Sequence, residues 1–404
     1  MSRRLVIVFG LLVLVMVSVA IAVLVRTAPQ DRQPDPDPSP TSTVPAAPVQ
    51  NTMLFAVRDD EGLIADSVVL GTVPSSRPTA GSWLSVQPGL SVDINANGTL
   101  TLSQRGAAAP VDIATNVANQ FGFTVDGAMI LDRLAFAALV DGVGGVAVPG
   151  GTAIVGEGTD GDPKVLVKPT QRKLFGPAAA NYVITLNPNE PQQARMDRFD
   201  EVFTQVILKL PGNVDRVRSI VGSLGALSRT SLAPERSAEI LLEIQTALTD
   251  RAVKSATAPT TVVGTSSAAV FTLNPAASLP TIQSLFGDSI LQPGINDALP
   301  RVRVYSAGVS NSSVVGTQEL LAGERLTMVW GGQKDPETTS KIYIPAESSR
   351  PFGERVAVLL GLPTDSVVVR PSQSAGAQAA VLLGPDSTLT KPSPTPSGVQ
   401  SPPE

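Results

Sequence analysis

The chain has 404 residues, of which 43% are hydrophobic, and it carries a formal net charge of −5. This length predicts two folded domains with flanking tails, and this charge argues against a nucleic-acid partner, which would require a dense basic patch. The sequence contains no cysteine and no histidine, which excludes disulfides, thiolate metal sites and Ser-His-Asp or Cys-His relays. Any catalysis would therefore depend on carboxylates, Arg, Lys, Tyr or a carboxylate-bound metal.

Residues 5–25 form an uninterrupted apolar segment without charges. At about 1.5 Å per residue, a helix of this length crosses the roughly 30 Å hydrocarbon core of a bilayer. Arg3 and Arg4 precede it and aspartates follow it, so the positive-inside rule places residues 1–4 in the cytoplasm as a short stub. A cleaved signal peptide is the alternative, but the segment is long for one. We expect a single-pass protein of the cell membrane, with its bulk extracytoplasmic and held off the bilayer by a proline-rich spacer over residues 26–50.

Residues 51–291 are expected to form the first folded domain, an α/β unit with helices packed on a sheet. In Val125–Val148, a short apolar run, a stripe at helical spacing and a glycine turn predict strand, helix and strand in succession. Apolar runs predict strands at 51–57, 66–73, 82–87, 90–94, 99–102, 182–186 and 269–273. Helical periodicity predicts helices at 112–121, 193–210, 214–227, 234–249 and 276–286. A loop is expected at 150–164 and an irregular stretch at 256–265.

A second, smaller α/β domain is expected at residues 300–386, after a hinge at 292–299, because strand and helix patterns alternate there. The predicted strands are 301–305, 326–330, 341–345, 366–369 and 379–384, and the predicted helices are 314–321 and 352–360. The final segment, 387–404, contains five prolines and few apolar residues, so we expect it to be disordered.

Short stretches in both domains are similar to a known family. They are Ala65–Leu70, LVDGVGGVAV at 139–148, RVRVY at 301–305, KIYIP at 341–345 and VLLGPD at 381–386. In these stretches the chain resembles the LytR-CpsA-Psr family, extracytoplasmic proteins that transfer undecaprenyl-phosphate-linked glycopolymers onto the bacterial cell wall. The resemblance implies a family-like sheet flanked by helices over residues 51–291, followed by a domain of the LytR C-terminal type.

The resemblance also implies where a site would lie. Active members of the family grip a pyrophosphate with clustered arginines and use an aspartate to hold Mg²⁺ against it. Asp66 matches that aspartate as a metal ligand. Arg195 and Arg198 match two of the arginines at the start of a helix, where an anion is favoured, although a solvated helix face is the alternative interpretation for both.

Three other family positions lack their cations. Hydrophobic or small residues stand in their place: Ile64-Ala65 before the aspartate, Pro88-Gly89 in the third strand, and Ile184 and Leu186 after Tyr182-Val183. Losing one charge-assisted contact costs about 1.5–3 kcal/mol, and losing several in one site removes the stabilisation of transition-state charge. The sequence therefore predicts a fold that has lost the reaction.

The favoured interpretation is a membrane-anchored, non-catalytic binding or scaffold protein for cell-wall polymer assembly, a pseudoenzyme with no predicted catalytic residue. Its expected partners are the membrane and a polyprenyl-phosphate glycan or peptidoglycan, with Arg58, Arg195 and Arg198 as ligand-binding residues. The alternative is an active Mg²⁺-dependent phosphotransferase that attaches polyprenyl-linked glycopolymers to peptidoglycan, with Arg58, Arg77 or Arg105 standing in for the missing arginines. A purely structural role in envelope assembly is the third hypothesis.

Other polar and glycine-rich segments have simpler explanations. Gly142–Gly145 lacks the spacing of a phosphate loop and is predicted to be a tight turn. Glu157, Asp160 and Asp162 could bind Ca²⁺ but lack the full calcium-loop pattern, so solvated loop acids are favoured. Turn, cap and core-packing roles are expected for three aspartates and two tryptophans: Asp126, Asp132, Asp141, Trp83 and Trp330.

Overall fold

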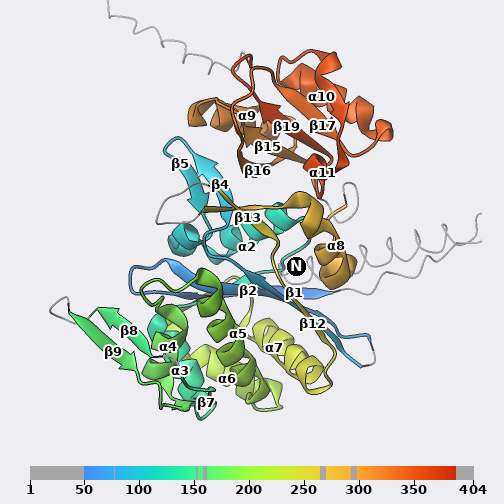
Figure 1. Ribbon diagram of the computed structural model, residues 1–404. Coiled ribbons are helices and arrows are strands. Elements are labelled where there is room, and N and C mark those ends of the chain that lie inside the picture. Colours follow the sequence, from blue (N-terminus) through green and yellow to red (C-terminus); the bar gives the residue numbers. More distant parts are fainter. Residues whose placement is uncertain are drawn as a thin grey trace, which may run out of the picture. The chain divides into compact units, whose positions relative to one another are not determined.

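The computed structural model describes residues 50–76, 78–151, 153–157, 162–263, 270–292 and 298–387 (Figure 1). The predicted membrane anchor, nearly all of the spacer, most of the hinge and nearly all of the tail lie outside these residues. Within the described ranges, no helix combines the length and the apolar character needed to cross a bilayer. Gln50, assigned to the spacer, is instead buried in the folded part, where its side chain donates a hydrogen bond of 2.8 Å to the carbonyl of Leu285.

The larger sheet is mixed and has six strands in the order β11-β6-β1-β2-β3-β12. Its strands are β1 Asn51–Arg58, β2 Ile64–Val73, β3 Ala80–Val86, β6 Ala128–Leu131, β11 Ser228–Thr230 and β12 Val253–Thr257. The first three strands pair antiparallel, whereas β6 runs parallel to β1 and β12 runs parallel to β3. The strands predicted at 51–57, 66–73 and 82–87 are therefore confirmed.

Helices cover both faces of this sheet (Figure 1). On one face lie α3 Arg133–Gly142, α4 Gly176–Ile184, α5 Gln192–Leu208, α6 Val214–Ser223 and α7 Pro234–Thr249. On the other face lie α2 Pro110–Phe121 and α8 Pro275–Phe286. The predicted helices at 112–121, 193–210, 234–249 and 276–286 are confirmed within two residues, because each has a regular apolar stripe that this arrangement buries.

The predicted strand, helix and strand of Val125–Val148 are present as β6, α3 and the short β7, Val146–Ala147. Asp132 caps α3, since its Oδ1 accepts a hydrogen bond of 2.8 Å from the Ala135 amide. Asp141 accepts one of 2.7 Å from the Gly176 amide and so joins the end of α3 to the start of α4. The capping role expected for Asp132 is confirmed, and Asp141 links two helices.

The smaller sheet has five strands in the order β16-β15-β19-β17-β18. Its elements are β15 Arg301–Ser306, α9 Asn311–Gly323, β16 Thr327–Gln333, β17 Lys341–Ile344, α10 Arg350–Leu359, β18 Val367–Val369, α11 Pro371–Ser374 and β19 Ala379–Leu383. The predicted alternation of strands and helices is confirmed. The helix predicted from residue 314 begins at Asn311, because Ser310 caps it by accepting a hydrogen bond from the Ser313 amide.

Three predictions about local structure are wrong. Residues 182–184 form the end of α4 and residues 185–186 follow it without regular structure, so the segment is not a strand. Gly176-Pro177 and three alanines start a helix whose apolar residues are buried. The expected loop at 150–164 contains a hairpin of β8 Ile154–Glu157 and β9 Pro163–Val167. The stretch at 256–265, expected to be irregular, contains the end of β12 and β13 Thr260–Val263, which pairs with β14 Val270–Leu273.

Candidate functional site

Asp66 lies in β2 on the face of the larger sheet that α3 to α7 cover. It stands opposite Val57 of β1, and this cross-strand pair points to the same face as the core residues Val68 and Leu70. Asp66 is fully buried, at 0% exposure, and its Oδ1 atom has no hydrogen-bond partner among the described residues. A buried carboxylate of this kind needs a nearby cation or donor to remain ionised.

Arg195, in the first turn of α5, supplies that cation. Its Nε lies 3.1 Å from Oδ2 of Asp66, and its side chain is only 12% exposed. Its other donors are directed at main-chain carbonyls: Nη1 donates to Ile184 at 3.3 Å and Nη2 donates to Ala65. The guanidinium therefore joins β2 to the end of α4, and its positive charge favours the ionised form of Asp66.

Arg198 lies one turn further along α5 and is also fully engaged. It forms an ion pair with Glu190, and its Nε and Nη2 donate hydrogen bonds of 2.7 Å each to the carbonyls of Tyr182 and Thr185. The last carbonyls of a helix have no partner within the helix and carry partial negative charge. Arg195 and Arg198 together satisfy three such carbonyls at the end of α4, which explains why both cations are held there.

A second carboxylate, that of the partly buried Asp200, was not anticipated from the sequence. It projects from α5 towards β3, where it accepts hydrogen bonds of 2.5 Å from Ser85 Oγ and 3.0 Å from Trp83 Nε1. Burial raises the pKa of Asp200 to about 6 against the lowering effect of these two bonds. Burial likewise raises the pKa of Asp66 to about 8; Arg195 lowers it, and the charge of Asp200 raises it further.

Asp200 borders a cavity of about 510 Å³ formed by α5, α7, β3 and β12. Its lining residues are Trp83, Ser85, Asp200, Glu201, Thr204, Gln205, Leu248, Val253, Ser255, Ala256 and Thr257. None of these residues is Lys or Arg, and the polar ones are carboxylates, hydroxyls and an amide. The cavity is therefore suited to a ligand that offers hydrogen-bond donors, and its carboxylates would repel a phosphate.

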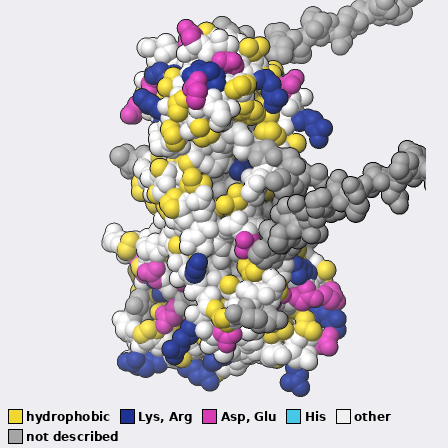
Figure 2. Space-filling model, turned by 90° about the vertical axis from the view of Figure 1, so that its right-hand side faces the viewer, with side chains coloured by type: hydrophobic (Ala, Val, Ile, Leu, Met, Phe, Trp, Pro, Cys, Tyr) yellow, Lys and Arg dark blue, Asp and Glu magenta, His cyan; other side chains and the backbone are white. Residues whose placement is uncertain are grey.

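The other arginines considered for the site lie elsewhere. Arg58 stands opposite Ile64, on the face of the sheet that α2 covers, and its Nη1 donates to the carbonyl of Gly106 at 3.3 Å. The sheet thus separates it from Asp66. Arg105 lies 3.9 Å from Asp93, and Arg77 is outside the described residues. On the face shown in Figure 2, basic and acidic side chains are interspersed and do not form one broad basic patch.

The residues around Asp66 do not fit a Mg²⁺ ion. Such an ion requires near-octahedral oxygen ligands and usually keeps several waters, whereas Asp66 is sealed from solvent and has Arg195 on Oδ2. Across the described ranges, no group of three or more His, Cys, Asp or Glu residues could hold a metal. Of the residues considered for calcium, Asp162 is exposed and Asp160 lies outside the described residues.

The fold and site define a class of protein: a mixed α/β sheet with helices on both faces and a buried carboxyl group held by an arginine of α5. Three solved structures are similar to the chain. TagV of Bacillus subtilis has a TM-score of 0.48 at 15% identity, covering 63% of this chain and 99% of TagV. TagT bound to LI-WTA has a TM-score of 0.45 at 19% identity, covering 60% of this chain and 91% of TagT.

The third is the LytR-Csp2A-Psr enzyme from Actinomyces oris, with a TM-score of 0.45 at 15% identity, covering 61% of this chain and 91% of that enzyme. All three likenesses are structural, at low sequence identity. No protein-family model matches the chain, and no curated protein sequence matches it.

Proposed function

We propose that this chain is a cell-envelope binding or scaffold protein of the LytR-CpsA-Psr type, which holds a glycan of cell-wall polymer assembly without transferring it. The predicted membrane anchor would place the folded part outside the cell. The observation that carries the proposal is the state of the two arginines of α5. Both guanidinium groups are satisfied inside the protein, by Asp66, Glu190 and main-chain carbonyls, and so offer no free cation to a diphosphate.

Recruiting these arginines to a ligand would be energetically unfavourable. Breaking a buried ion pair costs about 3–5 kcal/mol, because it leaves an uncompensated charge in a medium of low polarity. A charge-assisted hydrogen bond to a ligand returns about 1.5–3 kcal/mol. Moving the two guanidinium groups from the protein to a ligand would also leave the last carbonyls of α4 without their hydrogen-bond donors.

The Asp200 cavity offers a different mode of binding. Asp200 and Glu201 can accept hydrogen bonds from sugar hydroxyls, and Thr204, Ser255 and Thr257 can both donate and accept. We infer that the sugar part of a polyprenyl-linked glycan occupies this cavity, and that its charged diphosphate does not.

The test compares binding with turnover. The full-length chain in detergent is incubated with a polyprenyl-diphosphate-linked glycan, Mg²⁺ and peptidoglycan as acceptor, and both bound glycan and released polyprenyl monophosphate are measured. Release of this lipid monophosphate is called phosphate release below. We expect retention of the glycan without phosphate release, and at least about tenfold weaker retention by Glu201→Lys, which places a cation on the cavity wall. Asp197→Lys is the matched control, because Asp197 is exposed on the same helix and does not line the cavity.

Two outcomes would overturn the proposal. Phosphate release that disappears in Asp66→Ala would establish the phosphotransferase alternative. Equal loss of retention in Glu201→Lys and Asp197→Lys would show that the cavity does not hold the glycan.

A further inference from the structure

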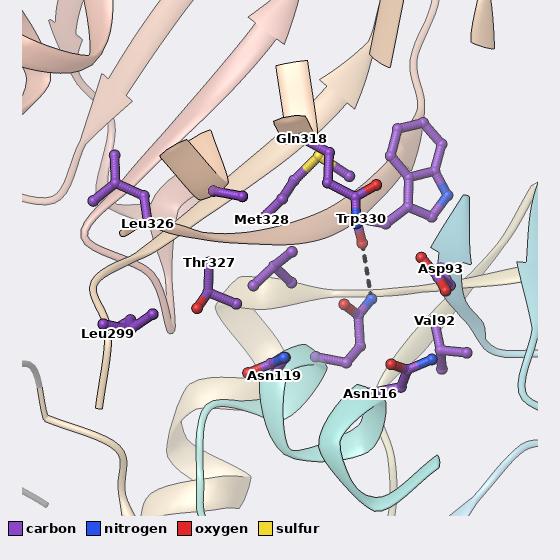
Figure 3. A pocket seen from close by; sticks show the side chains of 13 residues that line it. Val92, Asp93, Asn116, Asn119, Leu299, Gln318, Leu326, Thr327, Met328 and Trp330 are labelled. Carbon is purple, nitrogen blue, oxygen red and sulfur yellow. Dashed lines mark hydrogen bonds between the residues drawn. The ribbon is translucent and has the colours of Figure 1, made fainter. Parts of the chain in front are cut away.

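A second cavity, of about 350 Å³, lies between α2 and the β4–β5 hairpin on one side and β16 and α9 on the other (Figure 3). The hairpin consists of β4 Ser91–Asn95 and β5 Gly98–Thr101. The cavity shares no lining residue with the Asp200 cavity. Its volume is in the range of small-molecule sites, which is about 300–1,000 Å³.

Gln120, near the end of α2, presents an unsatisfied acceptor at this cavity. It is only 2% exposed, and its Nε2 donates to the carbonyls of Ser91 at 3.1 Å and Trp330 at 3.0 Å, the second of which is the dashed line in Figure 3. Its Oε1 has no partner among the described residues. The amide cannot be reversed, because reversal would direct its oxygen at two carbonyl oxygens. The buried Oε1 therefore requires a donor from outside the chain's own groups.

The cavity walls combine amide side chains with a small apolar surface. Asn119 from α2 and Gln318 from α9 lie on opposite sides of the drawn space, and Thr327 adds a hydroxyl (Figure 3). The apolar part is formed by seven residues: Val92, Leu299, Ala322, Leu326, Met328, Val329 and Trp330. Amides and hydroxyls both donate and accept, and the carboxylate of Asp93, which lies 3.9 Å from Arg105, also lines the cavity. The walls therefore disfavour an anion and favour an uncharged ligand that offers several hydrogen-bond donors and at least one methyl-sized apolar group.

We propose that this cavity binds an N-acetylated sugar, with the acetamido N–H donating to Gln120 Oε1. The acetamido methyl packs on the surface of Leu326 and Met328, and the ring hydroxyls are within the reach of Asn119, Gln318 and Thr327. A short peptide also has amide N–H groups, but it carries too few hydroxyls to use these three side chains. The site is therefore better matched by a sugar than by a peptide.

The experiment measures binding of free N-acetylglucosamine and glucose to the full-length chain in detergent, by saturation-transfer NMR. N-acetylglucosamine is expected to bind at least about tenfold more tightly than glucose, with the strongest transfer to its acetamido methyl, because only it offers the amide donor. Ala322→Trp fills the cavity from an exposed position on α9 and should abolish the signal. Leu320→Trp is the matched control, since it lies on the same helix, is 40% exposed and does not line the cavity.

Each remaining outcome would overturn the proposal. No binding of either sugar would show that a water satisfies Gln120. Equal binding of glucose would remove the acetamido assignment, and tighter binding of N-acetylglycine methylamide would assign the cavity to a peptide. Equal signals from Ala322→Trp and Leu320→Trp would place the sugar elsewhere. Because glycan retention in the Asp200 cavity is tested with Glu201→Lys, failure of one proposal is distinguishable from failure of the other.

Discussion

Arg195 and Asp66 form a buried ion pair between residues that are 129 positions apart in the chain, with 3.1 Å between Nε and Oδ2. The pair fastens the first turn of α5 to the middle of the larger sheet. The burial of the pair limits its chemistry, because Asp66 is inaccessible to solvent and each of the three Arg195 nitrogens already donates to an oxygen of the protein. If these buried charged groups and the core around them stabilise the fold, substituting them should lower the free energy of unfolding.

Asp66→Asn is expected to change how stability depends on pH. Burial raises the pKa of Asp66 from 3.8 to about 8, so the folded protein keeps a proton that the unfolded chain releases near pH 4. The free energy of unfolding of the wild type should therefore fall as pH rises from about 4 to about 8, by at most about 1.4 kcal/mol per pH unit from this residue. Urea unfolding of both proteins across this range measures the effect. A stability difference that stays constant with pH would contradict it.

Arg198→Ala is expected to destabilise the fold by about 3–5 kcal/mol. The substitution leaves Glu190 without its cation and removes donors from the carbonyls of Tyr182 and Thr185. Arg218→Ala serves as a control, because its pairs with Asp215 and Glu235 are exposed and such pairs contribute about 0–1 kcal/mol. The two changes in unfolding free energy are compared in urea, and similar losses would show that Arg198 does not fasten α4 to α5.

Periodicity predicted the long helices well, and local signals explain where it failed. The helix predicted at 234–249 has the same ends in the structure, because Pro234 starts it and Ile240, Leu241 and Ile244 form a buried stripe. The run at 182–186 was misassigned because a short apolar run fits a buried helix as well as a strand. The start signal at Gly176-Pro177 was the evidence that could have decided between them.

The site was less predictable than the fold. The residue types and helix position of Arg195 and Arg198 could be taken from the sequence, but their partners could not, because Glu190 and the carbonyls of α4 depend on the helix that replaced the expected strand. The sequence also gave no indication that Asp200 would border a cavity. It lies beside the apolar stripe of α5, next to Phe199, and only the position of β3 brings Trp83 and Ser85 to it.

Phe203→Ala is expected to destabilise the protein by about 3–5 kcal/mol, because Phe203 is 1% exposed and stacks on Phe55 with ring centroids 3.9 Å apart. Its removal leaves a cavity between α5 and the sheet. Phe175→Ala is the control, since that ring is 50% exposed and should cost well under half as much. Thermal or urea unfolding measures both, and equal losses would mean that this part of the core collapses to fill the space.

Gly122→Ala should cost more stability than Gly62→Ala, although both glycines have positive φ, of 84° and 80°. An alanine in this conformation costs about 1–2 kcal/mol at either site. At Gly62 the new Cβ would meet no atom within 4 Å, whereas at Gly122 it would lie 2.8 Å from Nη2 of Arg301 in β15. The excess loss at Gly122 therefore measures how firmly the hydrogen bonds to the carbonyl of Gly376 hold the Arg301 side chain in place. Equal losses in urea unfolding would show that Arg301 moves aside freely.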